Sequence, residues 1–138
     1  MTELIGCGRG SVTGDGYFFA PRVVRLPESD NVLKRQETFA PVLAMALADD
    51  VVADGVAMAA DSQMGLSASI LTERLDLAQA FARRVPAGLV SVNLPTTGVE
   101  YQAPFGGWNL SGGPFPEAGD RAHEFYTRSK TVAVSGTL

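Results

Sequence analysis

The sequence predicts an α/β fold, because strand-like and helix-like segments alternate along the middle of the chain. Three short apolar runs, at residues 42–48, 67–71 and 89–93, have the length of strands buried in a sheet. Amphipathic stretches at residues 51–60 and 73–85 separate these runs. Such short connections between strand, helix and strand require parallel strands joined by right-handed crossovers. We therefore expect a partial three-layer parallel sheet (βαβαβ), followed by a long carboxy-terminal loop, a helix and a terminal strand.

Length and composition set the class of protein. The 138 residues, of which 46% are hydrophobic and 19% charged, fit one globular domain covering residues 1–138. The net charge of -4 arises from scattered acidic and basic residues, so we expect neither nucleic-acid binding nor an anionic-membrane surface. The longest apolar run, residues 40–48, is about half as long as a membrane-spanning helix, and residues 1–3 lack the basic start of a secretory signal. These features are typical of a soluble cytoplasmic protein.

The first 30 residues are rich in glycine and turn formers and contain one extended candidate, residues 17–24, interrupted by a proline. This pattern predicts a loop with an edge strand. The first long apolar run is then stopped by Asp49 and Asp50. Either carboxylate can accept the free amide protons at the start of the following helix, so we interpret the two aspartates as caps.

The second predicted helix has clear signals at both ends. Thr72 caps it, and Glu73 lies near the positive end of the helix dipole. Pro86 and Gly88 end it. Its apolar stripe consists of Leu77, Ala78, Phe81 and Val85.

The last third has a different composition. Residues 94–119 hold six of the fifteen glycines and four of the eight prolines, which predicts a long ordered loop. A loop of this length inside a compact domain usually carries function. Residues 118–130 then favour a helix, and residues 131–135 a terminal strand.

The single cysteine, Cys7, and the single histidine, His123, exclude a disulfide framework and a metal site at the usual ligand spacing. The glycines beside Cys7 argue against a rigidly held nucleophile, so we interpret Cys7 as a bystander thiol. His123 is interpreted as a solvated helix residue. No metal site and no catalytic residue is therefore assigned.

Glu37 and the paired glycines at 106–107 are more informative. A carboxylate at the entrance to a buried strand can accept hydrogen bonds from both hydroxyls of a ribose, while the ring of Phe39 offers an apolar wall. A plain surface glutamate is the simpler interpretation of the residues alone. The paired glycines indicate either a close backbone approach or a bare tight turn, and the residues leave both open.

Three segments together resemble signature segments of the aldehyde dehydrogenase superfamily, in the right order and at about the right separation. They are Gln-Glu-Thr-Phe-Ala-Pro-Val at 36–42, Gly-Leu-Val-Ser-Val-Asn at 88–93 and Pro-Phe-Gly-Gly-Trp-Asn-Leu-Ser-Gly at 104–112. The chain departs from the family pattern at Ala40, Asn109 and Pro114, where glycine, lysine and glycine are usual. The resemblance extends over about residues 14–134 and implies the carboxy-terminal portion of the catalytic domain.

The resemblance implies roles for particular residues. By matching positions, Glu37 would hold the ribose next to the nicotinamide and Phe39 would pack near the nicotinamide itself, with NAD or NADP as the cofactor. The segment after Asn93 lines the aldehyde tunnel in that family. It nominates as substrate-binding residues Thr96, Thr97, Val99, Tyr101 and Phe105.

The stretches at 93–101, 117–119 and 124–127 look most like the 2-oxoglutarate semialdehyde dehydrogenase branch. The family's catalytic cysteine is expected farther upstream of Glu37 than Cys7 lies. We therefore expect a component that oxidises an aldehyde only together with an amino-terminal, cysteine-bearing portion.

Two alternatives remain open. In this family the terminal strand adds to a neighbouring subunit's sheet, so residues 131–135 could make the chain a non-catalytic protein-binding or homo-oligomerisation module. An unrelated small α/β domain with chance motif matches is the other.

Overall fold

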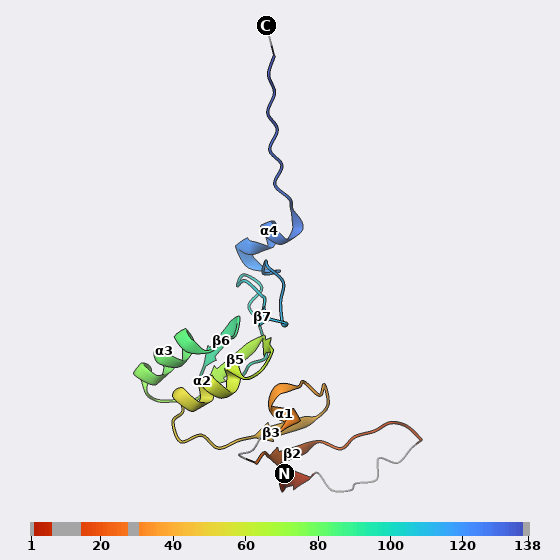
Figure 1. Cartoon of the computed structure of the whole chain (residues 1–138), viewed down its shortest axis with the longest axis vertical. Coiled ribbons are helices and arrows are strands. Elements are labelled where there is room, and N and C mark those ends of the chain that lie inside the picture. Colours follow the sequence, from red (N-terminus) through yellow and green to blue (C-terminus); the bar gives the residue numbers. More distant parts are fainter. Residues whose placement is uncertain (1, 7–14, 28–30, 137–138) are drawn as a thin grey trace.

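The computed structural model describes residues 2–6, 15–27 and 31–136 (Figure 1). Cys7 lies outside the described residues. The elements in chain order are β1 (Thr2–Gly6), β2 (Arg22–Arg25), α1 (Val32–Arg35), β3 (Val42–Met45), α2 (Ala53–Ala60), β4 (Met64–Gly65), β5 (Ser67–Ile70), α3 (Leu75–Arg84), β6 (Leu89–Val92), β7 (Trp108–Asn109), the 3-10 helix η1 (Gly119–Arg121) and α4 (Ala122–Tyr126).

The described strands form three small sheets. In the first, β1 is antiparallel to β2 and β2 is parallel to β3, with Arg22 opposite Val42. In the second, β4 is antiparallel to β7. In the third, β5 is parallel to β6, with Ser67 opposite Leu89. The α/β class predicted from the sequence is confirmed.

The predicted continuous βαβαβ sheet is wrong in one respect, because β3 pairs with β2 and not with β5. The chain that leaves α2 first enters β4, whose partner is β7, and only then reaches β5. The backbone N–H groups of Arg22 and Leu26 extend the β2–β3 ladder at both ends, at 2.9 Å from the carbonyl oxygen of Pro41 and 2.7 Å from that of Met45. The predicted parallel crossover from β5 through α3 to β6 is confirmed.

One of the two aspartates before α2, Asp50, acts as the predicted cap, whereas Asp49 takes part through its backbone N–H as a donor and not through its carboxylate. The Asp50 carboxylate accepts hydrogen bonds from the backbone N–H groups of Val52, at 2.9 Å, and Ala53, at 2.6 Å. The Asp54 carboxylate reaches back to the backbone N–H groups of Asp49 and Asp50, at 2.9 and 2.8 Å. The free amides at this end are thereby satisfied, and the regular helix begins at Ala53.

α3 begins later than predicted, at Leu75. The hydroxyl of Thr72, the predicted cap, accepts instead from the N–H of Arg74 at 3.1 Å, in the turn before the helix. Asn93, at the end of β6, holds this turn: its side chain accepts from the Thr72 N–H and donates to the Thr72 carbonyl, both at 2.9 Å. Asn93 has a φ of 55°, so the backbone leaves the strand here while the side chain continues the pairing.

The main core lies between α2, α3 and the β5–β6 sheet (Figure 1). Half-buried apolar residues from both helices and both strands pack against it. The buried members are Val52, Ile70, Phe81, Val85 and Ala87. This core stabilises the unit formed by α2, β5, α3 and β6, which we call the crossover unit. The carboxy-terminal loop follows directly after it.

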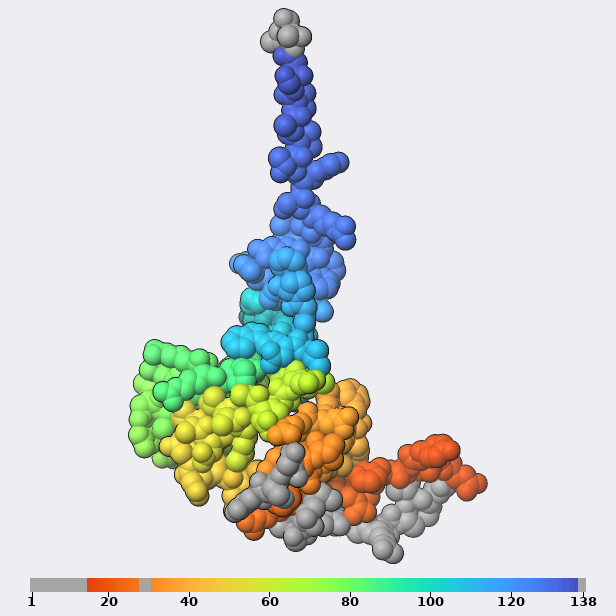
Figure 2. Space-filling view, viewed as in Figure 1, coloured from red at the N-terminus to blue at the C-terminus, as the bar shows by residue number. Residues whose placement is uncertain are grey.

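The carboxy-terminal end differs from its prediction. The helix expected over 118–130 is shorter, with η1 followed by α4, which ends at Tyr126. The strand expected over 131–135 is not formed, because no described segment lies beside it to take its backbone hydrogen bonds. These residues extend away from the body as a narrow stalk (Figure 2), with Val132 70% and Val134 88% exposed.

Candidate functional site

Glu37 and Phe39 lie in the loop at residues 36–41, which joins α1 to β3. α1 is a single short helix whose N-cap residue, Asn31, accepts a hydrogen bond from the Leu33 N–H at 3.0 Å. The loop's far end is held where the Pro41 carbonyl pairs with β2. The loop that carries Glu37 and Phe39 is therefore held at both ends by secondary structure.

Phe39 has an unusual conformation. Its φ is 46°, in the left-handed region that bulky residues avoid, and the residue is 95% exposed. Glu37 is exposed as well. A strained backbone that presents an aromatic ring to the outside is typical of a binding segment.

An open cavity of about 670 Å³ lies beside this loop. Glu37 and Phe39 form part of one wall, and Met64 belongs to the β4 strand on another side. Leu110 and Ser111, which follow β7, also line the cavity. Two of the three signature segments, 36–42 and 104–112, thus meet at one cavity although they are far apart in the sequence.

The five predicted substrate-side residues do not join this cavity. All five lie along the loop after β6, and within the described residues none of them lines the cavity beside Glu37. Tyr101 is 87% and Val99 43% exposed, whereas Phe105 is half-buried. Thr96 and Thr97 are exposed.

Backbone hydrogen bonds hold the substrate-side loop together. The Phe105 carbonyl accepts from the Glu117 N–H at 2.8 Å, and the Tyr101 carbonyl accepts from the Gly119 N–H at 3.3 Å. At the loop's start, the Ser69 hydroxyl donates to the Leu94 carbonyl at 2.6 Å. The loop is therefore ordered, as the sequence predicts.

The paired glycines mark a close backbone approach, which decides between the two interpretations left open by the sequence. A Cβ on Gly107 would lie 2.5 Å from the carbonyl oxygen of Ser111. A Cβ on Gly88 would clash with the carbonyl of Gly106. The second and third signature segments are thus packed against each other through backbone that only glycine permits.

Ser111 is a contact residue that the sequence reasoning missed. Its hydroxyl accepts from the Gly65 N–H at 3.0 Å and donates to the Met64 sulfur at 3.6 Å. The Leu110 N–H donates to the Gln63 carbonyl at 3.1 Å alongside. These bonds fix the signature segment at 104–112 to β4. The feature of the sequence that could have indicated Ser111 is its position inside that segment.

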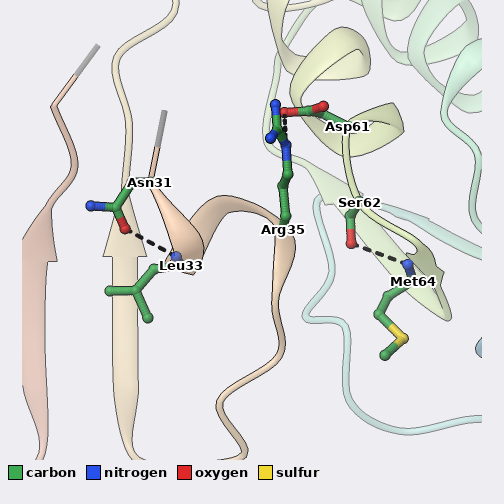
Figure 3. A network of polar contacts seen from close by, with 6 residues as sticks. All are labelled: Asn31, Leu33, Arg35, Asp61, Ser62 and Met64. Carbon is green, nitrogen blue, oxygen red and sulfur yellow. Dashed lines mark hydrogen bonds and ion pairs between the residues drawn. The ribbon is translucent and has the colours of Figure 1, made fainter. Parts of the chain in front are cut away.

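A second missed contact links α1 to the end of α2. The Arg35 Nε lies 3.0 Å from an Asp61 carboxylate oxygen. Figure 3 shows the two side chains pointing toward each other. Ser62 continues the contact into β4, since its hydroxyl accepts from the Met64 N–H at 3.1 Å. Polar contacts therefore connect the walls of the cavity.

The described residues contain no group of three histidine, cysteine, aspartate or glutamate side chains that could hold a metal ion. In the same part of the chain, no helix is long and apolar enough to cross a membrane. The cavity is lined by the carboxylate of Glu37 and the ring of Phe39, by the basic residues Lys34 and Arg35, and by a mixture of apolar residues and serines. These suit a hydroxyl-bearing ligand with a flat ring.

Comparison with known proteins decides the family. Residues 2–132 match the aldehyde dehydrogenase family. The chain belongs to this family. The resemblance inferred from the three signature segments is confirmed.

Two curated relatives are similar to most of this chain. The alpha-ketoglutaric semialdehyde dehydrogenase of Bacillus subtilis is 38% identical over 120 residues, which are 87% of this chain and 24% of the relative. The 2,5-dioxopentanoate dehydrogenase of Saccharolobus solfataricus is 37% identical over 126 residues, 91% of this chain and 26% of the relative. The chain thus spans about a quarter of the length of these aldehyde dehydrogenases.

Solved structures in the family show the same fold. The Mycobacterium tuberculosis aldehyde dehydrogenase complexed with NAD+ has a TM-score of 0.76 at 28% identity, covering 99% of this chain and 28% of that one. The Methanocaldococcus jannaschii glyceraldehyde-3-phosphate dehydrogenase complexed with NADP has a TM-score of 0.67 at 27% identity, covering 80% and 22%. Both nicotinamide cofactors therefore occur among the structural neighbours.

Proposed function

We propose that this chain is the carboxy-terminal portion of the catalytic domain of an NAD- or NADP-dependent aldehyde dehydrogenase. It acts together with a cysteine-bearing portion, whether that portion belongs to the same polypeptide or to another. The observation that carries the proposal is the meeting of two signature segments at one cavity, with Glu37 and Phe39 exposed beside it.

The chemistry of the loop fits the nicotinamide end of the cofactor. The Glu37 carboxylate has acceptor oxygens for the two ribose hydroxyls, and the Phe39 ring offers a face for the nicotinamide. When bound, NAD or NADP supplies the acceptor for the aldehyde's hydride. This chain's residues orient that acceptor, because correct placement of the reacting atoms removes much of the barrier.

The proposed substrate is an acidic semialdehyde such as 2-oxoglutarate semialdehyde, oxidised to the dicarboxylate. The names of the Bacillus and Saccharolobus relatives support this class. The substrate-side residues are Thr96, Thr97, Val99, Tyr101 and Phe105. Their position on an ordered loop, with several side chains exposed, supports a surface that closes when the cysteine-bearing portion packs against it.

The partner is the cysteine-bearing portion or a second copy of the enzyme, and we place the assembly in the cytoplasm. Residues 131–135 suit addition to a neighbouring sheet, because their backbone groups lie outside the described sheets and Val132 and Val134 are exposed. The same feature favours the second candidate function, a non-catalytic oligomerisation module.

The test reconstitutes the chain with a cysteine-bearing portion and follows single-turnover NADH formation from 2-oxoglutarate semialdehyde, with the chain alone as the blank. Glu37→Gln removes the charge from the ribose contact and should slow hydride transfer by an amount equivalent to about 1 to 3 kcal/mol. Glu73→Gln is the matched control, since Glu73 is exposed in the turn before α3 and does not line the cavity.

Equal rates for Glu37→Gln and wild type would contradict the role of Glu37. A complex that forms stably but makes no NADH with either cofactor would favour the oligomerisation module instead.

A further inference from the structure

The ion pair between Arg35 and Asp61 lies beside the proposed cofactor loop, residues 36–41. Neither residue is part of that loop. We infer that this pair is a positioning contact: it holds the 36–41 loop, with Glu37 and Phe39, in register with the opposite wall of the cavity. The inference rests on the proposed function for the meaning of the site, and on the geometry alone for the contact.

On one side, the pair fixes the entry of the loop. Arg35 is the last residue of α1, so its side chain is anchored directly before residue 36. The exit is fixed by the hydrogen bond of 2.9 Å from the Arg22 N–H to the Pro41 carbonyl. Between these ends Phe39 is held at a φ of 46°, a conformation that persists only where the surroundings restrain the backbone.

On the other side, Asp61 belongs to a rigid part of the molecule. It closes α2, and its N–H donates to the Ala57 carbonyl at 3.0 Å. The next residue, Ser62, binds the Met64 N–H at the start of β4, as Figure 3 shows. β4 is in turn bound by Ser111 from the third signature segment. The pair therefore connects the Glu37 loop to the segment that lines the other side of the cavity.

Because the pair is exposed, it can affect the position of the loop without contributing much to the stability of the fold. The Arg35 and Asp61 side chains are 53% and 49% exposed. Ion pairs this open to water contribute little to the free energy of folding and are weakened by salt. Removing the pair should therefore leave the fold intact while the loop samples more conformations.

The first arm of the experiment needs no enzyme activity. Hydrogen–deuterium exchange is measured on the full chain for the hydrogen-bonded backbone amides at the two ends of the loop, that of Gln36, which donates to the Val32 carbonyl, and that of Arg22, which donates to the Pro41 carbonyl. Arg35→Gln and Asp61→Asn should each exchange about threefold to tenfold faster than wild type, because the loop opens more often. Arg35→Lys, which keeps the charge, should lie near wild type, and the reversed pair Arg35→Asp with Asp61→Arg should restore slow exchange.

Arg84→Gln is the control for loss of a positive charge, since Arg84 lies in the last turn of α3 and does not line the cavity. It should leave exchange at the Gln36 and Arg22 amides unchanged. Thermal unfolding of every variant should stay close to wild type, which shows that any faster exchange is local.

The second arm uses the complex with the cysteine-bearing portion. A loosened loop lowers the fraction of molecules ready to bind, so Arg35→Gln should raise the KM for the cofactor about threefold to tenfold while kcat changes less than about twofold. Glu37→Gln, which touches the ribose directly, should mainly lower kcat. This split distinguishes a positioning residue from a contact residue.

Unchanged exchange in both single variants overturns the inference, and so does a reversed pair that fails to restore it. An unchanged KM in a complex that works overturns it as well. If the wild-type complex makes no NADH while exchange responds as expected, the proposed function fails and the positioning contact stands.

Discussion

The crossover unit over residues 52–92 and the first sheet, β1–β2–β3, differ in how much of their apolar surface is buried. The crossover unit encloses a core of its own between α2, α3, β5 and β6. The described side chains of the first sheet region bury only Val24 and Leu26. Along β3 and just beyond it, Leu43 is 59%, Met45 45% and Leu47 71% exposed. One part of the molecule is held by its own packing, while the other offers an apolar surface and carries the proposed cofactor loop.

This difference indicates that the crossover unit provides most of the stability and that the first sheet provides a surface for binding. The apolar run at 42–48 has the composition of a strand covered on both faces, yet only alternate residues of β3 are half-buried. Changes in the crossover unit should therefore act on folding. Changes around the first sheet should act on what binds there.

The largest expected effect compares two phenylalanines. Phe81 is 8% exposed in the core, so Phe81→Ala should lower the free energy of unfolding by about 3 to 5 kcal/mol. Phe39 is 95% exposed, and Phe39→Ala should change it by less than about 0.5 kcal/mol. Urea unfolding of the chain measures both. Similar losses from the two variants would remove the contrast between the regions.

Two glycines give the next comparison. Gly88→Ala drives a Cβ into the Gly106 carbonyl and should cost about 1 to 3 kcal/mol, because backbone must move. Gly55→Ala, inside α2 with open space around it, should instead stabilise by about 0.5 to 1 kcal/mol through helix propensity. Thermal unfolding reports both signs. A stable Gly88→Ala chain would mean that the third segment does not pack on β6 as described.

The exposed face of β3 provides a smaller effect on stability. Leu43→Thr and Met45→Thr should each change the unfolding free energy by no more than about 0.5 kcal/mol and should reduce aggregation, which light scattering detects. Val24→Thr on buried β2 is the matched control and should cost about 1 to 3 kcal/mol. Equal losses at all three positions would show that β3 is covered within the chain itself.

The smallest effect concerns acid. The hydrogen bonds from Arg74 to Asp76, at 2.5 and 3.1 Å, lower the pKa of the Asp76 carboxyl below its usual value of 3.8. A lowered folded-state pKa means stability that is present above 3.8 and is lost as the pH falls through the folded-state pKa. Asp76→Asn should therefore flatten the decline of the melting temperature as the pH falls below 3.8, by a small amount because the pair is exposed. Parallel curves for variant and wild type would contradict this.

The crossover unit could be predicted from the sequence because its signals are local. The periodic stripe of α3 and the two short apolar runs beside it specify β5, α3 and β6 with boundaries close to those observed. The cap at Asp50 follows from the same local chemistry. The long ordered loop followed from its glycine and proline content.

The remaining elements depend on contacts between distant residues. β4 and β7 are two residues each, and only their mutual pairing, Gly65 opposite Trp108, makes them strands. The break in the predicted sheet follows from this pairing. The segment at 131–135 has the composition of a strand but no described neighbour.

The candidate site was predictable only in part. Glu37 and Phe39 were found through the resemblance, and their roles stay predictions. The Arg35–Asp61 pair was missed because its residues are 26 positions apart and exposed, so neither periodicity nor composition marks them. Ser111 was missed for a similar reason, since a serine reveals its partner only when two segments come together.

Trp108 gives the chain an optical reporter of its own. It is the single tryptophan, it lies on β7 at the third signature segment, and the residue is 56% exposed. Indole emission shifts to shorter wavelength when water around the ring is replaced by protein. The intrinsic fluorescence of this chain therefore reports, without any label, whether another surface has covered the strand that supports the cavity.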